Sequence, residues 1–373
     1  MIKVGITGQA GFVGTHLFNA FSLEPDLFSL VPFKDEYFDD PLILKSWAEQ
    51  CDTIVHLAAL NRHNEPEVIL QTNIRLVKEL IQALEGCSSC AHLLFSSSTQ
   101  EDFDNLYGQS KKEGRELLMH WAENKGAVFT GLVIPNVFGP FGNPYYNSVV
   151  ATFSHQLAHN ETPRLDVDKK LNLIYVGELV REIRSCILNK VSDPEFRVPS
   201  TSEYKVSEIL ALLENYKTTY ADKGELPSLA NAFERNLFNT FRNYMDIPKH
   251  FPVSLKEHSD ERGSFVETMR LGLGGQVSFS TTLPGITRGN HFHTRKIERF
   301  VVIKGKARIQ LRQIGTDHVI EYQLDGNEPS FVDMPVWYTH NITNVGDEEL
   351  FTLFWINEFF DPDDPDTYYE NVE

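Results

Sequence analysis

Short apolar runs alternate with amphipathic stretches along the first half of the chain. Between the apolar runs, hydrophobic residues recur at helical spacing, for example over residues 68–84 and again from Tyr107 onward. Strands that alternate with helices predict an α/β Rossmann-like fold, a doubly wound parallel sheet whose ligands bind at the carboxyl ends of the strands. Five apolar runs have the length and composition of buried strands: residues 3–7, 27–31, 52–59, 92–95 and 128–134.

The pattern changes in the last third of the chain. A final helical segment over residues 229–244 is followed by the proline-rich stretch 248–252. Many short strands then follow at regular spacing, which favours an all-β sandwich or jelly roll. We therefore expect two domains, residues 1–247 and residues 253–373. The short strands are predicted at residues 276–280, 299–303, 307–311, 319–324 and 351–355.

Composition agrees with two domains and argues against some classes of partner. A chain of 373 residues with 41% hydrophobic residues can fill two cores. A net charge of −18 argues against binding to nucleic acid or to an anionic membrane surface. No apolar run reaches the length of a membrane span and the N-terminus lacks a signal pattern, so we expect a cytoplasmic protein. Its four cysteines are then expected to be reduced, and the Cys87/Cys90 pair to belong to a loop.

A glycine-rich turn joins the first strand to the first helix. Gly8, Gly11 and Gly14 follow the strand directly, and Phe12 and Val13 begin the helix. Glycines here permit a tight turn and a close approach of the backbone to a pyrophosphate, and the start of the helix supplies N–H groups for the phosphates. The strand–turn–helix context predicts a dinucleotide-binding site.

Two further stretches concern the cofactor. Lys34 follows the second strand, where an acidic residue would bind the ribose 2′-hydroxyl of NAD. Because a lysine there can meet a 2′-phosphate, the predicted cofactor is NADPH (NADP). The third strand runs through His56 into Leu57 and Ala58, a small-residue turn suited to lie along the cofactor. We expect the His56 side chain to be packed rather than catalytic.

The candidate reaction centre follows the fourth strand. That strand ends in Ser96-Ser97-Ser98, and Tyr107 and Lys111 lie four residues apart on a helix, so their side chains share a face. A nearby ammonium group is expected to lower the pKa of the phenol. Such a tyrosine, with a serine hydroxyl to hold a carbonyl, can donate a proton during ketone reduction. Ser98 is the predicted carbonyl partner and Ser97 the alternative, since neighbouring strand residues point to opposite faces.

Residues 1 to about 245 resemble the extended short-chain dehydrogenases/reductases of the nucleotide-sugar group. The resemblance rests on the glycine turn, the Tyr107/Lys111 pair, Pro135-Asn136 and residues 171–176. Dehydratases of this group carry an Asp-Glu pair after the catalytic hydroxyl residue, whereas Thr99-Gln100 follows Ser98 here, so a reductase is expected. The resemblance implies cofactor contacts from Asn73 and Pro135, and a sugar-nucleotide pocket that includes Asn136, Tyr145 and Asn147.

Histidine and carboxylate residues in the C-terminal part have the spacing of a metal site. His291 and His293 alternate along a strand, Glu298 is expected on the next strand and His340 on a distant one. Three imidazoles and one carboxylate suit Zn²⁺, and also Mn, Fe or Ni. His291, His293 and Glu298 match the first motif of the cupin family, and His340 belongs to the second. The second motif departs from the family pattern because Trp337 replaces the usual glycine.

The same region also resembles deoxysugar 3,5-epimerases, through residues 260–267 and the run Arg288-Gly289-Asn290-His291. In those enzymes the histidine of the run acts as a base without a metal. His291 can therefore be a metal ligand or a base.

The whole chain, including residues 357–368, resembles bifunctional capsular-polysaccharide enzymes in which an extended short-chain reductase is fused to a C-terminal cupin. The resemblance implies C3 epimerisation of a UDP-4-keto-6-deoxy-N-acetylhexosamine in the cupin and NADPH-dependent reduction at C4 in the reductase. The implied product is UDP-N-acetyl-6-deoxy-L-talosamine, the precursor of N-acetyl-L-fucosamine, and the resemblance also implies bound zinc and a homodimer. Two alternatives stay open: a dTDP-linked 4-keto-6-deoxyhexose as substrate, and a cupin that binds metal only for stability and dimerisation.

Overall fold

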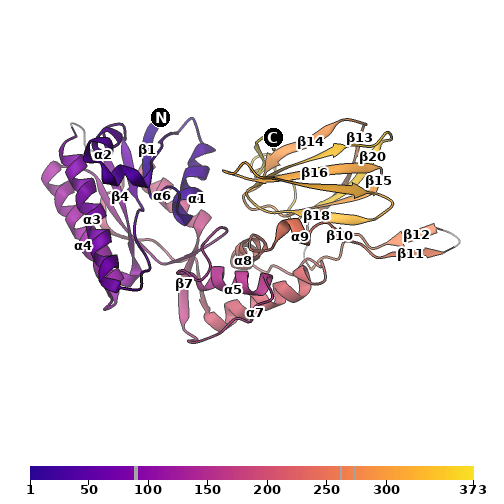
Figure 1. The fold of residues 1–373 in the computed structure, drawn as a ribbon, viewed down its shortest axis with the longest axis horizontal. Helices are drawn as coiled ribbons and strands as arrows, with labels where there is room; N and C mark the ends of the chain where they lie inside the picture. The colour runs from indigo at the N-terminus through magenta and orange to yellow at the C-terminus, as the bar shows by residue number, and fades with distance from the viewer. Residues whose placement is uncertain (88–90, 261–262, 273) are drawn as a thin grey trace. The chain divides into compact units, whose positions relative to one another are not determined.

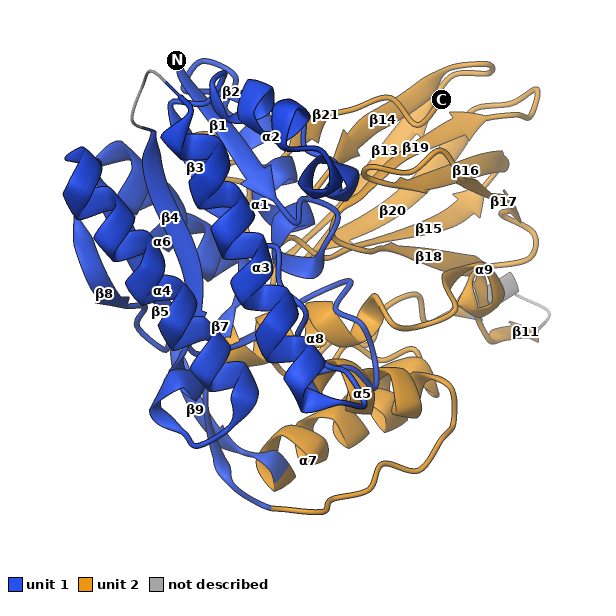
Figure 2. Ribbon diagram, turned by 60° about the vertical axis from the view of Figure 1, so that its left-hand side comes forward, with its two compact units in different colours: residues 1–149, 168–206 blue, residues 150–167, 207–373 orange. Residues whose placement is uncertain are grey.

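The computed structural model describes residues 1–87, 91–260, 263–272 and 274–373, which form two compact units. The first unit contains residues 1–149 and 168–206, and the second contains residues 150–167 and 207–373 (Figure 2). Cys90 of the cysteine pair, and Glu261 and Arg262 of the epimerase-like motif, lie outside the described residues. The predicted division into domains of residues 1–247 and 253–373 stays a prediction.

A six-stranded parallel sheet forms the centre of the first unit (Figure 1). All five neighbouring pairs are parallel, so the carboxyl ends of the strands share one edge. The predicted doubly wound α/β fold is thereby confirmed, and apolar strand residues such as Val4, Ile54 and Leu93 are buried in it. In sheet order the strands are β2 (Phe28–Val31), β1 (Ile2–Thr7), β3 (Thr53–His56), β4 (His92–Ser98), β5 (Phe129–Ile134) and β8 (Asp193–Arg197).

Helices cover both faces of this sheet. Side chains of α1 (Phe12–Ser22) and α6 (Val176–Leu188) pack on one face, in a core with β1. On the other face, α2 (Pro41–Ala48), α3 (Pro66–Glu85) and α4 (Leu106–Lys125) form a second core. A small separate sheet consists of β6 (Asn136–Phe138), β7 (Lys170–Tyr175) and β9 (Ser202–Lys205).

The second unit contains helices and two antiparallel five-stranded sheets. Its helices are α5 (Val149–Ala158), α7 (Val206–Tyr216), α8 (Ala232–Arg242) and α9 (Ile247–His250), with a π-helical turn at Lys217–Ala221. One sheet has the order β10 (Val253–Ser254), β18 (Ser330–Met334), β15 (Glu298–Lys304), β20 (Leu350–Ile356) and β13 (Gln276–Thr282). The other has the order β17 (Val319–Asp325), β16 (Lys306–Gln313), β19 (Tyr338–Asn344), β14 (Thr287–Phe292) and β21 (Tyr368–Tyr369).

The two sheets are the all-β region expected from the sequence and are consistent with a cupin jelly roll. A separate hairpin, β11 (Glu257–Asp260) and β12 (Gly263–Val266), precedes them. Among the described residues, none of the helices is both long and apolar enough to span a membrane.

Buried charges join the helices of the second unit to its first sheet. Arg299 on β15 donates to both carboxylate oxygens of Asp333 on β18, at 2.7 and 2.9 Å, and both side chains are almost fully buried. The Tyr220 hydroxyl donates to Asp333 at 2.7 Å, and Arg242 of α8 donates to the Tyr220 hydroxyl and to the Met334 carbonyl. The helical segment after residue 206 is therefore part of this unit's core.

Candidate functional sites

The glycine turn has the backbone geometry that a pyrophosphate site requires. Gly8 has a φ of +67°, and a Cβ there would lie 2.9 Å from the backbone of Ala58. A Cβ on Gly14 would lie 2.2 Å from the carbonyl oxygen of Gly8. Helix α1 begins at Phe12, and no side chain caps its first N–H groups. These groups suit the phosphates of a dinucleotide.

Hydrogen bonds of the Thr7 side chain connect the ends of β1 and β3 next to this turn. The Thr7 hydroxyl lies 2.6 Å from Nδ1 of His56 and accepts the N–H of Ala58 at 3.2 Å. Burial, with a smaller contribution from the charge of Lys111, lowers the pKa of His56 to about 3, so the ring is neutral. His56 is packed, as its place on a buried strand predicts, while Leu57 and Ala58 lead out of the sheet edge.

Two other predicted cofactor residues, Lys34 and Asn73, differ in their exposure to solvent and in their hydrogen bonds. Lys34 is exposed and directly precedes a short 3₁₀ helix over Asp35–Asp39. Asn73 is buried on α3, and its amide bonds to both backbone groups of Leu60 and to the Ser110 hydroxyl. Asn73 therefore fixes the loop after β3, whereas Lys34 is available to a ligand.

Tyr107, Lys111 and Ser98 come together where β4 ends and α4 begins. Lys111 Nζ donates to the Ser96 carbonyl at 2.8 Å and lies 5.7 Å from the centre of the Tyr107 ring. Tyr107 hydrogen-bonds with Ser98, whose hydroxyl also accepts the N–H of Gln100 at 3.2 Å. The predicted shared face of Tyr107 and Lys111 is thus present in the structure.

The expected direction of the Tyr107 pKa is wrong for this structure. Burial and, to a smaller extent, the neighbouring Tyr146 raise the pKa of Tyr107 to about 12, although the hydrogen bond with Ser98 opposes them. Burial also lowers the pKa of Lys111 to about 8, because its ammonium group lies in the interior. The sequence spacing predicted that the Lys111 ammonium group lies beside the Tyr107 phenol. It could not predict that both groups are buried away from water.

The two serines at the end of β4 point to opposite faces. Ser97 is buried and donates to Glu101 at 2.7 Å, and Arg115 binds the same carboxylate at 3.1 Å. Ser98, and not Ser97, therefore shares the Tyr107 site. The Glu101 carboxylate is thus bound by Ser97 and Arg115 on the face opposite Ser98.

A loop before α5 adds a residue that sequence reasoning passed over. Tyr145 has a φ of +58° and an exposed ring, and Arg62 donates to the carbonyls of Tyr145 and Tyr146. The Tyr146 hydroxyl accepts the N–H of Asn61 and is close enough to Tyr107 to raise its pKa. Tyr146 thus borders the reaction centre.

The predicted residues around this loop keep their amides within the protein. Asn147 donates to the Asn61 carbonyl at 3.2 Å, and Asn136 donates to the Asn172 carbonyl at 3.1 Å. Pro135 links β5 to β6 and so sets where Asn136 lies. These residues shape the backbone beside the reaction centre.

The four candidate metal ligands converge between the two sheets of the second unit. His291 on β14 is in register with His340 on β19, His293 directly follows β14, and Glu298 begins β15 of the other sheet. Their ligand atoms all lie within 4.8 Å of one another. The ring centres are 4.6 to 5.5 Å apart. His293, Glu298 and His340 are buried, and His291 is partly exposed.

The donor atoms fit a divalent metal ion. Glu298 Oε2 lies 3.1 Å from Nε2 of both His293 and His340, yet among the described residues these three buried atoms have no hydrogen bond of acceptable geometry. Ligands about 2.0–2.2 Å from a tetrahedral ion would be separated by about 3.3 Å. Orphaned buried donors and acceptors at this spacing are what an ion would satisfy.

The other ring nitrogens bind to backbone groups. His293 Nδ1 lies 2.5 Å from the Asp366 carbonyl, and His340 Nδ1 lies 3.2 Å from the Tyr338 carbonyl. His291 makes a backbone hydrogen bond to Gly289. A carbonyl only accepts, so Nδ1 of His293 and of His340 carries a proton and Nε2 faces the site, which is the arrangement found around metal ions.

In the turn before His340, Trp337 adopts a backbone conformation that usually requires glycine. Trp337 has a φ of +63°, in the region that favours glycine. Its N–H donates to the His293 carbonyl at 2.8 Å, and its ring stacks on Phe292 with a centre distance of 5.6 Å. The tryptophan therefore connects the turn to the end of the other ligand strand.

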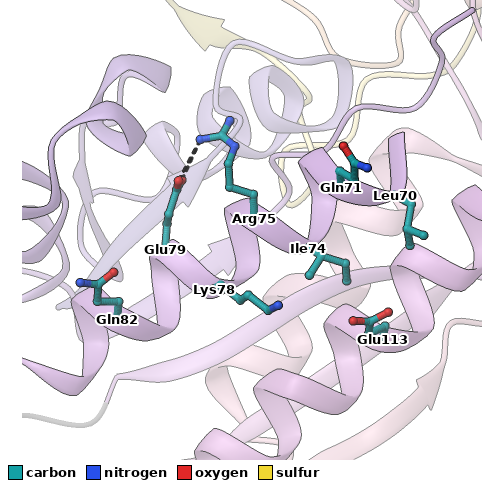
Figure 3. Close-up of a pocket in the computed structure, with 8 residues that line it drawn as sticks. All are labelled: Leu70, Gln71, Ile74, Arg75, Lys78, Glu79, Gln82 and Glu113. Atoms are coloured by element: carbon teal, nitrogen blue, oxygen red, sulfur yellow. Dashed lines mark hydrogen bonds and ion pairs between the residues drawn. The ribbon is translucent and has the colours of Figure 1, made fainter. Parts of the chain in front are cut away.

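A groove of about 460 Å³ lies along α3 and α4 of the first unit (Figure 3). Residues of α3 and Glu113 of α4 line it, and Figure 3 shows the Arg75–Glu79 ion pair, 2.9 Å long, on its wall. None of the predicted site residues lines this groove, so we assign it no part in the chemistry.

Known proteins match both halves of the chain. The model of the NAD dependent epimerase/dehydratase family matches residues 4–198, and that of the polysaccharide biosynthesis C-terminal domain matches residues 258–368. A UDP-2-acetamido-2,6-beta-L-arabino-hexul-4-ose reductase from Pseudomonas aeruginosa is 33% identical over 371 residues, 98% of each chain. The capsular polysaccharide assembling protein CapF from Staphylococcus aureus matches over 100% of both chains, with 35% identity and a TM-score of 0.61. The chain belongs to the CapF-type members of the NAD dependent epimerase/dehydratase family.

The CapF-type match includes both candidate sites. Tyr107 and Lys111 lie in the region matched by the epimerase/dehydratase family, and the four candidate metal ligands lie in the region matched by the C-terminal domain. RMD from Pseudomonas aeruginosa, whose structure is a complex with NADPH, is 22% identical with a TM-score of 0.53 over 58% of this chain and 83% of its own. This likeness shows the nucleotide-binding fold alone.

Proposed function

We propose that this CapF-type chain is a bifunctional nucleotide-sugar enzyme that epimerises C3 of a UDP-linked 4-keto-6-deoxy-N-acetylhexosamine and reduces its C4 ketone. The observation that carries the proposal is the presence of two complete sets of chemical groups in one chain. One is the Tyr107/Ser98/Lys111 constellation beside a dinucleotide turn, and the other is the buried His/Glu cluster. The name of the Pseudomonas relative, a UDP-linked hexul-4-ose reductase, supports the substrate class.

In the first site, Tyr107 holds the proton that the C4 oxygen receives. Its raised pKa keeps the phenol protonated at neutral pH, and Ser98 lies beside it to accept or donate a hydrogen bond at the carbonyl. Lys111, fixed to the Ser96 carbonyl, places a cation next to the phenolate that forms. When bound, NADPH supplies the hydride that adds to C4. The ketone thus becomes an alcohol by gaining one hydride and one proton.

In the second site, His293, Glu298, His340 and His291 would hold one divalent metal ion, with Zn²⁺ the ion that three imidazoles and a carboxylate suit best. When bound, such an ion supplies a Lewis acid that polarises a ketone oxygen and so acidifies the proton on C3. His291 is the ligand nearest solvent, which makes its position the side open to substrate.

A non-catalytic metal site is the second candidate for this unit. Three of the four ligands are buried, and structural zinc sites are typically closed by four protein ligands. In that case the ion would stabilise the fold and no C3 exchange would occur in this unit. Exchange of the C3 proton with solvent separates the two candidates.

We also propose that the protein is a homodimer, as the sequence resemblance implies. The edge strand β13 supports this, because its Val277 and Phe279 side chains are 56% and 67% exposed. A second copy that packs over these side chains at the edge of the sheet would cover them. Light scattering should give twice the chain mass for the parent and a smaller mass for Phe279→Lys; a monomeric parent would contradict the proposal.

The reductase proposal is tested by Tyr107→Phe in the full-length protein. Removal of the phenolic proton should slow the NADPH-dependent reduction of a 4-keto substrate by roughly 10²–10⁴-fold. NADPH binding, measured by fluorescence titration, should be nearly unchanged. Tyr37→Phe, on a partly buried tyrosine of the same unit that packs against Phe33, is the matched control. Normal reduction by Tyr107→Phe would refute the assignment.

A further inference from the structure

The last segment of the chain, residues 357–373, runs back to the strands that carry the metal ligands. Asp366 is its most enclosed polar residue, with 2% of its surface exposed and a φ of +40°. It lies 73 positions from His293 in the sequence, but its carbonyl oxygen is the partner of His293 Nδ1 at 2.5 Å. The hydrogen bond sets the orientation of the imidazole, so that Nε2 faces Glu298.

The carboxylate of Asp366 holds the loop between two ligands. One oxygen accepts the N–H of Thr294 at 3.1 Å and the Thr294 hydroxyl at 2.6 Å. The other accepts the N–H groups of Arg295 at 3.0 Å and Lys296 at 2.9 Å. Four donors on one carboxylate fix the backbone that connects His293 to Glu298.

The same segment also binds the two strands that carry the remaining histidines. Strand β21 pairs with β14, with Tyr369 opposite His291. The N–H of Glu370 donates to the Asn290 carbonyl at 3.0 Å, and the Glu370 carbonyl accepts the hydroxyl of Thr339, the neighbour of His340. Residues 366–370 therefore contact His291 and His293 themselves, the neighbour of His340, and the three residues 294–296 of the loop that leads to Glu298.

From these contacts we infer that residues 366–370 are the outer layer that positions the metal ligands, and that Asp366 is its principal positioning residue. The inference rests on the metal site proposed above. Hydrogen-bond partners behind first ligands set the ring orientation and the basicity of those ligands, and their loss typically lowers metal affinity by about 10–100-fold. Asp366 supplies such a partner to His293 and rigidity to the loop that ends at Glu298.

The test compares Asp366→Asn with Asp363→Asn in the full-length protein. Asparagine tolerates a positive φ and keeps one acceptor oxygen, but its NH₂ group would face the N–H groups of Arg295 and Lys296. Asp363 is exposed on the same segment and loses the same charge. Zinc affinity is measured by chelator competition, and the ligand geometry by the visible absorption of the Co²⁺-loaded protein.

We expect Asp366→Asn to weaken zinc binding by about 10-fold or more and to change the Co²⁺ spectrum, while Asp363→Asn matches the parent. Circular dichroism of the metal-free proteins confirms that each variant is folded at the temperature used. A folded Asp366→Asn variant with parental affinity and spectrum would overturn the inference. If the asparagine variant does not fold, Thr294→Val, which removes only the hydroxyl contact to Asp366, gives the same comparison with a smaller expected loss. A parent that binds no metal would instead refute the proposed metal site.

Discussion

At the scale of single residues, the two hydroxyls at the end of β4 have different partners and should have different roles. Ser98→Ala removes the hydroxyl beside Tyr107 and should lower the reduction rate by about 10-fold or more, the order of one lost hydrogen bond of about 1.5 kcal/mol. Ser97→Ala removes only the bond to Glu101 and should leave the rate within about twofold while lowering stability by about 1 kcal/mol. Steady-state kinetics and denaturation of both variants check this pair. The reverse order of effects on the rate would place Ser97 in the site.

Lys34 is the residue on which the choice between NADPH and NADH depends in our account. It is exposed, so its contact with a 2′-phosphate should contribute no more than about 1 kcal/mol. Lys34→Ala should therefore weaken NADPH binding by about two- to fivefold and leave NADH binding nearly unchanged. Fluorescence titration measures both constants, and Lys112→Ala, an exposed lysine on α4, is the control. Tighter binding of NADH than NADPH by the parent protein would contradict the assignment.

At the scale of elements, the buried charge network fixes the helices of the second unit to β15 and β18. Burial would raise the pKa of Asp333, but the adjacent Arg299 outweighs it and holds the pKa below its usual value. A lowered carboxyl pKa stabilises the fold fully above the unfolded-state pKa of about 3.9, and that stabilisation is lost as the pH falls. Asp333→Asn should lower the free energy of unfolding by about 3–5 kcal/mol at neutral pH.

Denaturant unfolding of Asp333→Asn, with the exposed Asp347→Asn as control, measures this contribution. A loss below about 1 kcal/mol would show that the network contributes little. The network also contains Tyr220 and Arg242, so a fragment that starts at residue 253 would leave Arg299 and Asp333 without these partners. Point variants of the full chain are therefore better probes of the second unit than truncations.

The metal-ligand cluster, formed by β14, β15 and β19, should bind its ion less tightly as the pH falls. For His293, burial alone would lower the pKa, but Glu298 outweighs it and the pKa is raised above the ordinary value of 6.5. Where the pH lies below that raised pKa, zinc must displace a proton from His293, and zinc affinity should fall by about tenfold per pH unit for each displaced proton. Chelator competition between pH 5 and 8 measures this slope, and an affinity independent of pH would contradict His293 as a ligand.

At the scale of the whole molecule, the sequence predicted the fold class and the candidate metal ligands, but not how deeply the side chains of the two sites are buried. Periodicity predicted five of the six strands of the parallel sheet, but not β8, and it predicted five strands of the β region, because the alternation of buried and exposed residues is a local property of the sequence. Spacing could not show that burial raises the pKa of Tyr107, or that Trp337 adopts a conformation typical of glycine. Asp366 was also missed, because its contacts to His293 and Thr294 join positions more than 70 residues apart.

The groups of each proposed reaction lie within a single unit. Tyr107, Ser98, Lys111 and the glycine turn belong to the first, and the four metal ligands belong to the second. Removal of a proton beside a ketone needs a base and a group that polarises the oxygen, but no nicotinamide. The central claim is therefore that the two reactions can be abolished one at a time.

The most direct test is mass spectrometry of the sugar after reaction in deuterated water. The parent enzyme should place deuterium at C3 without NADPH, and its reduced product should keep that deuterium. Tyr107→Phe should still exchange the C3 proton but form no reduced product, and His340→Ala should reduce a ready-made C3 epimer without placing deuterium at C3. If either folded variant loses both activities, or if His340→Ala exchanges C3 at the parental rate, the account of two separate sites is contradicted.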